Sequence, residues 1–368
     1  PCYVIDENII EENCKVLADV MKKTGCHVLL AQKAFSNYAL YPLIGKYLSG
    51  TTASGLYEAR LGREEMGREN HVFAPAYKDE DMDELVKICD HIVFNSISQL
   101  EKHKEKCRNV SIGIRVNPEF STQDGHEIYD PCGKGSRLGV TAGLLRNADL
   151  TGIDGLHFHT LCEQNSDDLK KTLDVVEEKF DFLLRKVKWV NFGGGHHITR
   201  KDYDVELLCD CITRIKEKYN VKVYIEPGEA VALNAGYFIT TVLDKVKNSG
   251  ITCLILDGSA ACHMPDVLEM PYTPPLSEGS IIETPEKEFD YRLGGNTCLA
   301  GDIIGNYRFD HDVQIGERLT FCDMAIYSMV KNNTFNGIPL PSIYSMDRKG
   351  DCRLIKSFGY NDFKERLS

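Results

Sequence analysis

The feature that most constrains the fold is a regular alternation in the first two-thirds of the chain. Short apolar runs are separated by longer amphipathic stretches, which is typical of β/α units. Eight strands are predicted, at 26–32, 50–54, 71–74, 91–95, 110–117, 155–159, 187–192 and 221–226. Eight units in roughly 235 residues match the size of a closed (β/α)8 TIM barrel. A doubly wound open sheet is the alternative.

The stretches between these strands carry helical periodicity. Four helices are predicted, at 8–23, 56–69, 79–89 and 167–186. In the last of them Leu169, Leu173, Val176 and Phe180 recur on one face, at the spacing by which a helix covers a core. Such helices are the second half of each β/α unit.

After Asn234 the rhythm changes to strands without long helices between them. These strands are predicted at 237–247, 251–257, 301–310 and 316–324. Residues 2–6 precede the first helix and can pair with this sheet instead of the barrel. We therefore predict two domains, a (β/α)8 barrel over 8–234 and a β-sandwich or β-barrel domain over 235–368 together with 1–7.

The net charge and the cysteines limit the classes of protein to which this chain can belong. The net charge is −12, with the acidic residues spread along the chain, so nucleic acid is not an expected partner. The fourteen cysteines are scattered without a C-x-x-C pair, and no run of residues is apolar and long enough to span a membrane. We expect reduced thiols and a cytoplasmic protein. Because the chain opens at Pro1, we expect a short leader to be missing.

Lys33 directly follows the apolar run V-L-L-A-Q at the end of the first predicted strand. The βα loops of a barrel open on the face where its strands end, and chemistry is placed there. A lysine that emerges from an apolar strand loses hydration of its charge, so its pKa falls and its free amine can form a Schiff base. The alternative is a lysine whose stem packs on the strand while its amine stays in water.

Two further motifs follow the seventh and eighth predicted strands. Gly193, Gly194 and Gly195 let the backbone approach an anion, and their N–H groups can surround a phosphate. Barrels often hold phosphate in this region, which favours a phosphate site over a flexible turn. Glu226, in I-E-P-G-E, can keep a pyridine nitrogen protonated. A turn acid before Pro227 is the alternative.

Two histidines lie on the sixth predicted strand. We assign the side chains of His157 and His159 to opposite faces, so that only His159 lines the pocket and stacks on an aromatic ring. His157 is then packed between strand and helix. A metal-dependent barrel hydrolase is the rival enzyme class, because H-x-H pairs bind metal there. In those enzymes the pair belongs on the first strand, so we predict no metal.

In combination, these motifs resemble the alanine-racemase-like barrel decarboxylases, which include ornithine and diaminopimelate decarboxylases. The resemblance covers nearly the whole chain and implies the fold type III of enzymes that use pyridoxal 5′-phosphate. It implies that Lys33 in A-Q-K-A-F carries the cofactor and that His159 in H-F-H stacks on its ring. The triple glycine matches the family's phosphate loop, and Glu226 in E-P-G matches the acid on the pyridine nitrogen.

The resemblance extends into the β domain. C-L-A-G-D gives Cys298 and Asp302 the family's C-x-x-x-D spacing, and Tyr327 in A-I-Y-S-M matches a tyrosine that touches the phosphate. The family implies a homodimer with shared active sites, in which Cys298 from the partner subunit returns a proton to Cα after CO2 leaves. A racemase with the same cofactor, and a regulator that has lost catalysis, are the alternatives. The C-x-x-x-D element favours decarboxylation, and the chain retains both the lysine and the cysteine.

Three stretches resemble one branch of this family more than its cousins. F-G-G-G-H-H-I-T, H-T-L-C-E-Q and H-M-P-D-V-L-E-M-P-Y are similar to the branch that converts carboxynorspermidine and carboxyspermidine to norspermidine and spermidine in polyamine biosynthesis. The cousins usually read E-P-G-R, whereas Glu229 stands here, and diaminopimelate enzymes carry Glu where Leu299 follows the cysteine. A decarboxylase of diaminopimelate, ornithine or arginine is the alternative. Candidates to pair with the amines of a cationic carboxylated polyamine are Glu229, Asp302, Asp266 and Glu269.

Overall fold

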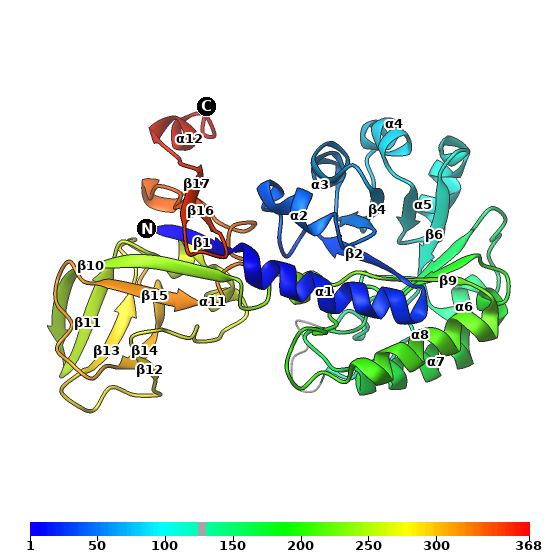
Figure 1. Ribbon diagram of the computed structural model, residues 1–368. Coiled ribbons are helices and arrows are strands. Elements are labelled where there is room, and N and C mark those ends of the chain that lie inside the picture. The colour runs from blue at the N-terminus through cyan, green and yellow to red at the C-terminus, as the bar shows by residue number, and fades with distance from the viewer. Residues whose placement is uncertain (124–129) are drawn as a thin grey trace. The chain divides into compact units, whose positions relative to one another are not determined.

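The structure is a computed structural model that describes residues 1–123 and 130–368 (Figure 1). It divides into two compact units. The first consists of Glu11–Lys33 and Tyr38–Val231, and the second of Pro1–Ile10, Ala34–Asn37 and Ala232–Ser368. In the described part of the chain, no helix is both long and apolar enough to cross a membrane.

The first unit is a closed barrel of eight strands, each parallel to its neighbours. Pairing of the first barrel strand with the last closes the barrel, which confirms the predicted fold and excludes the open sheet. All eight predicted strands are present. They are β2 (His27–Ala31), β3 (Gly50–Ala53), β4 (Glu69–Phe73), β5 (His91–Phe94), β6 (Ser111–Arg115), β7 (Gly155–His157), β8 (Trp189–Asn191) and β9 (Lys222–Ile225).

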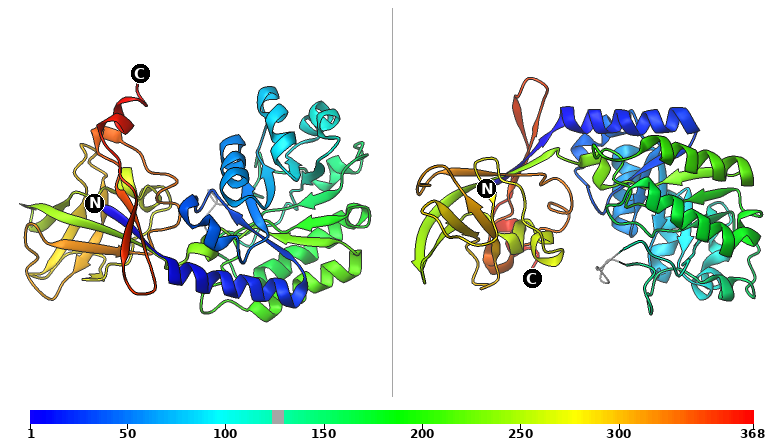
Figure 2. Two further views of the ribbon diagram at one scale, coloured as in Figure 1. Left: turned by 45° about the horizontal axis from the view of Figure 1, so that its top comes forward. Right: turned by 90° about the horizontal axis from the view of Figure 1, so that it is seen from below.

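Helices surround these strands (Figure 2). The apolar face predicted for the long helix after β7 is buried, because Leu169, Leu173, Val176 and Phe180 are all at most 1% exposed. The predicted helix at 56–69 is shorter, since its turns end at Met66 and Gly67 adopts a left-handed φ of 65°. The longer helices are α1 (Glu7–Thr24), α3 (Leu56–Leu61), α4 (Asp79–Ile88), α5 (Ile97–His103), α7 (Ser166–Leu184) and α8 (Val205–Tyr219).

The barrel interior is filled by large side chains. Leu29, Val93, Trp189 and Tyr224 form one buried cluster, against which Phe73 packs. Gly155 makes room for the indole, because a Cβ at this position would lie 2.0 Å from a ring atom of Trp189. The strands therefore surround a packed core, and their ends are left to carry polar groups.

The second unit is a mixed nine-stranded sheet, in the order β12-β14-β13-β11-β10-β1-β16-β17, with β15 paired to β10. As predicted, β1 joins this sheet: it lies antiparallel to β10 and parallel to β16. The strands are β1 (Cys2–Asp6), β10 (Gly236–Asn248), β11 (Ile251–Leu256), β12 (Ser280–Ile281), β13 (Asp290–Gly294), β14 (Ile303–Arg308), β15 (Arg318–Cys322), β16 (Ser342–Met346) and β17 (Cys352–Lys356).

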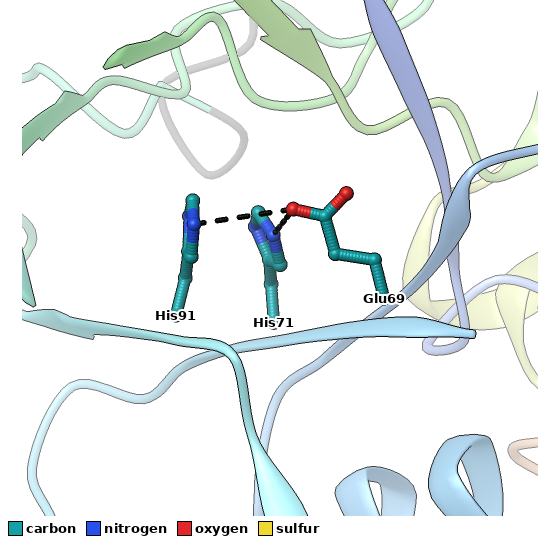
Figure 3. Close-up of side chains that lie close together, drawn as sticks. All are labelled: Glu69, His71 and His91. Carbon is teal, nitrogen blue, oxygen red and sulfur yellow. Dashed lines mark hydrogen bonds and ion pairs between the residues drawn. The ribbon is translucent and has the colours of Figure 1, made fainter. Parts of the chain in front are cut away.

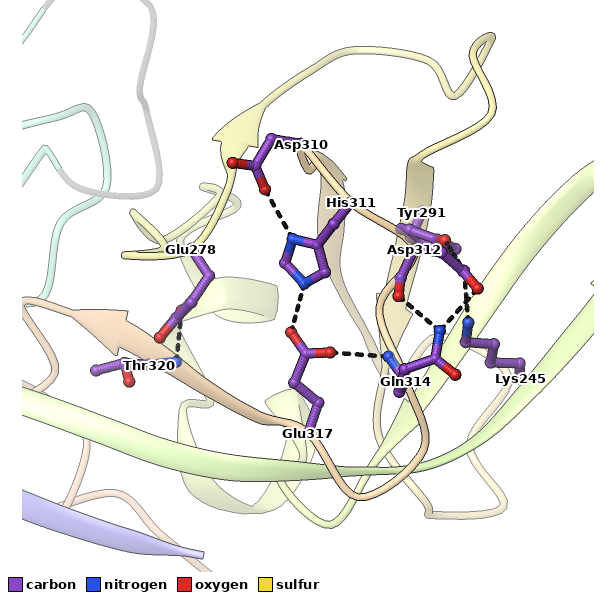
Figure 4. A network of polar contacts seen from close by, with 9 residues as sticks. All are labelled: Lys245, Glu278, Tyr291, Asp310, His311, Asp312, Gln314, Glu317 and Thr320. Atoms are coloured by element: carbon purple, nitrogen blue, oxygen red, sulfur yellow. Dashed lines mark hydrogen bonds and ion pairs between the residues drawn. The ribbon is translucent and has the colours of Figure 1, made fainter.

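A polar network holds the loop between β14 and β15 (Figure 4). His311 lies between two carboxylates, with Nδ1 2.7 Å from Asp310 and Nε2 2.8 Å from Glu317. Hydrogen bonds to both carboxylates raise the pKa of His311. Asp312 accepts hydrogen bonds from Lys245 and Tyr291, both at 2.7 Å, so the loop is tied to two strands of the sheet.

Candidate active site

Four of the predicted site motifs lie at the carboxyl ends of barrel strands. Lys33 comes two residues after β2 and His159 two residues after β7, while Gly193 follows β8 and Glu226 follows β9. Parallel strands of a barrel end on one face, so the structure brings all four motifs to the same face. Two direct contacts join three of them: the Gly194 N–H donates to His159 Nδ1 at 2.8 Å, and the Glu226 N–H donates to the Gly193 carbonyl at 2.8 Å.

Glu226 is a buried carboxylate held by side chains from two other strands. Asn191 Nδ2 donates to its Oε1 at 2.8 Å, and His157 Nε2 lies 3.3 Å from its Oε2. Burial alone would raise the pKa of Glu226, but the interactions with His157 and Asn191 outweigh it and lower the pKa to about 2. The carboxylate is therefore ionised at neutral pH, as an acid that must keep a pyridine nitrogen protonated would be.

The prediction for His157 was wrong. Residues two apart on a strand share a face, so the premise of opposite faces does not hold. The contacts of His157 show that it points into the barrel and not between strand and helix. There its ring stacks on Phe73, with centroids 5.4 Å apart, and its Nε2 faces Glu226. Burial lowers the pKa of His157, so a neutral imidazole can donate its N–H to the carboxylate. This histidine belongs to the site.

His159 has its ring orientation set by the backbone. Because Nδ1 accepts the Gly194 N–H, a neutral ring carries its own proton on Nε2. Burial, with the charges of Lys33 and Arg115, lowers the pKa of His159 well below its usual value. Arg115 Nη2 donates to the His159 carbonyl at 3.1 Å, and its guanidinium lies 4.6 Å from the Phe73 ring centre. The ring is therefore neutral and fixed.

Lys33 is solvent-accessible, yet protein atoms surround it closely enough to replace part of its hydration. This burial lowers the pKa of the Lys33 amine, and the positive charge of Arg115 adds to the effect, while Glu226 opposes it. A lower pKa increases the fraction of free amine, and the free amine is the form that can bond an aldehyde. The direction agrees with the prediction made from the apolar run before it.

The turn formed by the three glycines has no room for side chains. Gly193 and Gly195 have left-handed φ angles of 70° and 81°, and a Cβ on Gly194 would lie 2.7 Å from the Glu226 carbonyl. The N–H groups of Gly193 and Gly194 are already used, by Asn191 Oδ1 at 2.9 Å and by His159. Of the three amides, only that of Gly195 makes no hydrogen bond to the described residues. The Gly195 amide is therefore the one that can donate a hydrogen bond to an anion.

The structure adds a histidine that the sequence motifs did not indicate. His197 Nε2 lies 3.0 Å from Glu229 Oε2, and both side chains are largely buried. Glu163 completes a group whose ligand-type atoms all lie within 4.8 Å of one another. The available signal was the pair of histidines directly after the triple glycine. Asn191 and Arg115 were missed as well, although each is a polar residue at a strand end.

In the sheet unit, Asp302 and Cys298 have different surroundings. Asp302 is buried and accepts three hydrogen bonds, from Ser259 Oγ at 2.8 Å, Thr297 Oγ1 at 2.6 Å and the Ala261 N–H at 3.1 Å. Cys298 is exposed, and its backbone N–H donates to Asn336 Oδ1 at 2.7 Å. The buried aspartate thus organises the loop that presents the cysteine.

The remaining predicted residues of the sheet unit also have partners. Asp266 and Glu269, at the two ends of the short helix α11 (Asp266–Glu269), both form ion pairs with Lys331. Tyr327 has a left-handed φ of 48°, and its N–H donates to the Ala34 carbonyl at 2.9 Å. A carboxylate that is already paired with a lysine has less to offer to a substrate amine.

The barrel face suits the predicted cofactor. An amine of lowered pKa, a buried ionised carboxylate and a neutral imidazole of fixed orientation come together there, next to a glycine turn with an available amide. These are the groups needed to bond an aldehyde, keep a ring nitrogen protonated, lie against a ring and bind a phosphate.

Comparison with known proteins agrees. A family model described as pyridoxal-dependent decarboxylase, C-terminal sheet domain, matches residues 2–325. A carboxynorspermidine/carboxyspermidine decarboxylase of Campylobacter jejuni is 44% identical, and the match covers 100% of this chain and 98% of that protein. A carboxyaminopropylagmatine decarboxylase of Synechocystis is 39% identical, with 100% and 95% covered.

Solved structures show the same relationship. The crystal structure of carboxynorspermidine decarboxylase from Campylobacter jejuni, complexed with norspermidine, matches with a TM-score of 0.93 and 43% identity, over 100% of this chain and 99% of that one. The metal-dependent hydrolase and the racemase are therefore not retained. This chain belongs to the pyridoxal-dependent decarboxylases, enzymes whose cofactor is pyridoxal phosphate, as the motifs predicted.

Proposed function

We propose that this enzyme decarboxylates carboxynorspermidine and carboxyspermidine to norspermidine and spermidine, as a step of polyamine biosynthesis. The observation that carries the proposal is the 44% identity, over the whole chain, to a relative that bears this name. The predicted alternative, a decarboxylase of diaminopimelate, ornithine or arginine, has weaker support, because the diaminopimelate decarboxylases of Methanocaldococcus jannaschii and Aquifex aeolicus are 26% identical.

A second substrate comes from the same comparison. The Synechocystis relative, at 39% identity, is named for carboxyaminopropylagmatine. The difference between 44% and 39% is small, so carboxyaminopropylagmatine is the competing substrate.

Residues of the barrel face would hold the cofactor and set its chemistry. Bound pyridoxal phosphate supplies an aldehyde that bonds the substrate amine and a ring that accepts the electrons left when CO2 departs. Lys33 would hold the aldehyde, and Glu226 would keep the ring nitrogen protonated through its lowered pKa. His159 would lie against the ring. The phosphate would be bound by the turn at Gly193–Gly195, chiefly through the Gly195 amide, and by Tyr327.

The substrate end of the site is proposed from charge. Glu229 stands where the cousins carry arginine and would meet an amine of a cationic carboxylated polyamine. The oxygens of Asp302 already accept three hydrogen bonds. This residue would therefore hold its loop in place and would not bind an amine directly. Asp266 and Glu269 would first have to release Lys331.

We propose a homodimer in which the exposed Cys298, supplied by the partner subunit, returns a proton to Cα. The barrel over 8–234 would then bind the cofactor, and the sheet domain over 235–368, with 1–7, would complete the neighbouring site. The cytoplasm remains the proposed location, in keeping with fourteen cysteines of which none forms a disulfide within the described residues. Nucleic acid is not a proposed partner.

Gly194→Ala is expected to weaken cofactor binding by at least about tenfold, because the added Cβ would force apart the Glu226 backbone and the His159 ring. The dissociation constant of pyridoxal phosphate can be measured by its absorbance and fluorescence during titration of cofactor-free protein. Gly143→Ala, where a Cβ meets nothing within 4 Å, is the control and should bind as the wild type does. Equal affinity in both variants would contradict the role of the turn.

Turnover of a substrate panel tests the proposed function. Carboxynorspermidine, carboxyspermidine, carboxyaminopropylagmatine, diaminopimelate, ornithine and arginine are compared by CO2 release and by identification of the amine product. The first two are expected to have kcat/KM values at least about a hundredfold above the three amino acids, none of which combines an internal secondary amine with a terminal primary amine for Glu229 to pair with. Fastest turnover of carboxyaminopropylagmatine would select the second substrate, and fastest turnover of diaminopimelate, ornithine or arginine would reject the proposal.

A further inference from the structure

A polar cluster occupies the opposite end of the barrel interior, where the strands begin (Figure 3). Glu69 is the first residue of β4 and His91 is the first residue of β5, with His71 two residues beyond Glu69 on the same strand. The two imidazoles stand side by side on neighbouring strands, and the Glu69 carboxylate turns toward both. Decarboxylation at the strand ends uses none of these three residues.

The His91 side chain has no hydrogen-bond partner among the described residues. Its Nδ1 is buried without a partner, and its Nε2 lies 3.9 Å from Glu69 Oε1, which is too long for a hydrogen bond. Glu69 Oε1 is instead engaged by His71 Nε2 at 2.9 Å. His91 is only 9% exposed, so this polar ring is buried at a cost and is directed at a carboxylate it does not reach.

We propose that Glu69, His71 and His91 bind a divalent ion of the zinc type at the strand-start end of the barrel. Two imidazole nitrogens and one carboxylate oxygen are a common protein ligand set for zinc. Their ligand atoms lie within 4.8 Å of one another. Ligands at ~2.1 Å from a tetrahedral ion are about 3.4 Å apart. This value lies between the two separations from Glu69 Oε1, 2.9 Å to His71 Nε2 and 3.9 Å to His91 Nε2.

The protonation states favour binding. Burial lowers the pKa of His91 to about 3, so the ring is neutral at pH 7 and offers a lone pair without losing a proton. For Glu69, burial would raise the pKa, but the nearby imidazoles of His27 and His71 outweigh it and keep the carboxylate ionised. At this end of a barrel, an ion would contribute stability and not catalysis.

Binding of zinc should change the fluorescence emission of one residue, Trp189. The rings of His71 and His91 are stacked with planes 26° apart, so both must turn for their lone pairs to converge on one ion. His91 also stacks on Trp189, with centroids 4.6 Å apart. Trp189 is the only tryptophan of the chain, so the tryptophan emission comes from a ring that contacts this cluster.

The experiment titrates Zn²⁺ into tag-free holoenzyme that has been stripped of metal with a chelator. Calorimetry and Trp189 emission are expected to saturate together at one equivalent per chain. Bound zinc should also raise the thermal midpoint by roughly 5 °C at a hundredfold excess over Kd. Absence of saturable binding up to about 1 mM Zn²⁺, or saturation with unchanged Trp189 emission, would overturn the proposal.

Variants locate the ion. His91→Phe keeps an aromatic ring on Trp189 but removes a ligand, and should weaken zinc binding by at least about a hundredfold. Glu69→Gln is the second variant, in case the first does not fold. Glu229→Gln is the control, because it removes a carboxylate from the other glutamate–histidine group, at the strand ends. Loss of zinc in Glu229→Gln, with retention in His91→Phe and Glu69→Gln, would place the ion at that group and reject the site.

Discussion

Lys33→Ala is expected to abolish the absorbance of the lysine-bound cofactor and to lower kcat at least about a thousandfold. The reason is that burial lowers the pKa of this amine in spite of the opposing charge of Glu226, which suits it to bond an aldehyde. The test is an absorbance scan of the purified variant with added pyridoxal phosphate, together with CO2 release from carboxynorspermidine.

Lys188→Ala is the matched control. Lys188 directly precedes β8, is exposed and pairs with Asp154 at 2.7 Å, so its loss removes a lysine from the same barrel without touching the strand ends. It should keep the spectrum and kcat of the wild type. An unchanged spectrum in Lys33→Ala would mean that another lysine carries the cofactor, and would remove the central residue of the proposed site.

Glu226→Gln is expected to lower kcat by about 10²–10⁴-fold while the protein stays folded. The amide has nearly the shape of the carboxylate and can still accept the hydrogen bond of Asn191, but it lacks the charge that would keep a ring nitrogen protonated. Steady-state kinetics and the thermal midpoint measure the two parts of this expectation, and the cofactor spectrum is recorded with them.

A second glutamate provides the comparison. Glu177 has the same side-chain exposure as Glu226, 11%, but lies on α7, where it pairs with Arg214 and Lys218. Glu177→Gln should retain kcat within about twofold of the wild type, since ion pairs on an outer helix affect stability by ~1 kcal/mol or less. If Glu226→Gln is as active as Glu177→Gln, the charge at position 226 does not support the chemistry.

Strands with strong local signals were predictable, and strands without them were not. The barrel strands are buried apolar runs between turn residues, which local pattern reveals. By contrast, β12 is two exposed residues and β17 is mostly exposed, so neither carries an apolar alternation. β13 is buried but does not look so in the sequence, because it begins with the charged Asp290. In the structure this carboxylate is paired with Arg308 of the adjacent strand. Such strands depend on neighbours distant in the sequence.

By itself, the sequence determined the number and order of the barrel strands and placed Lys33, His159, the triple glycine and Glu226 after four of them. Only the tertiary structure decided which side chains meet. His157 reaches Glu226 across 69 residues of chain, and Gly194 reaches His159 across 35. The physical reason is that apolar periodicity is a local property of the sequence. These contacts exist only once the barrel has closed, because closure sets the directions of side chains that come from different strands.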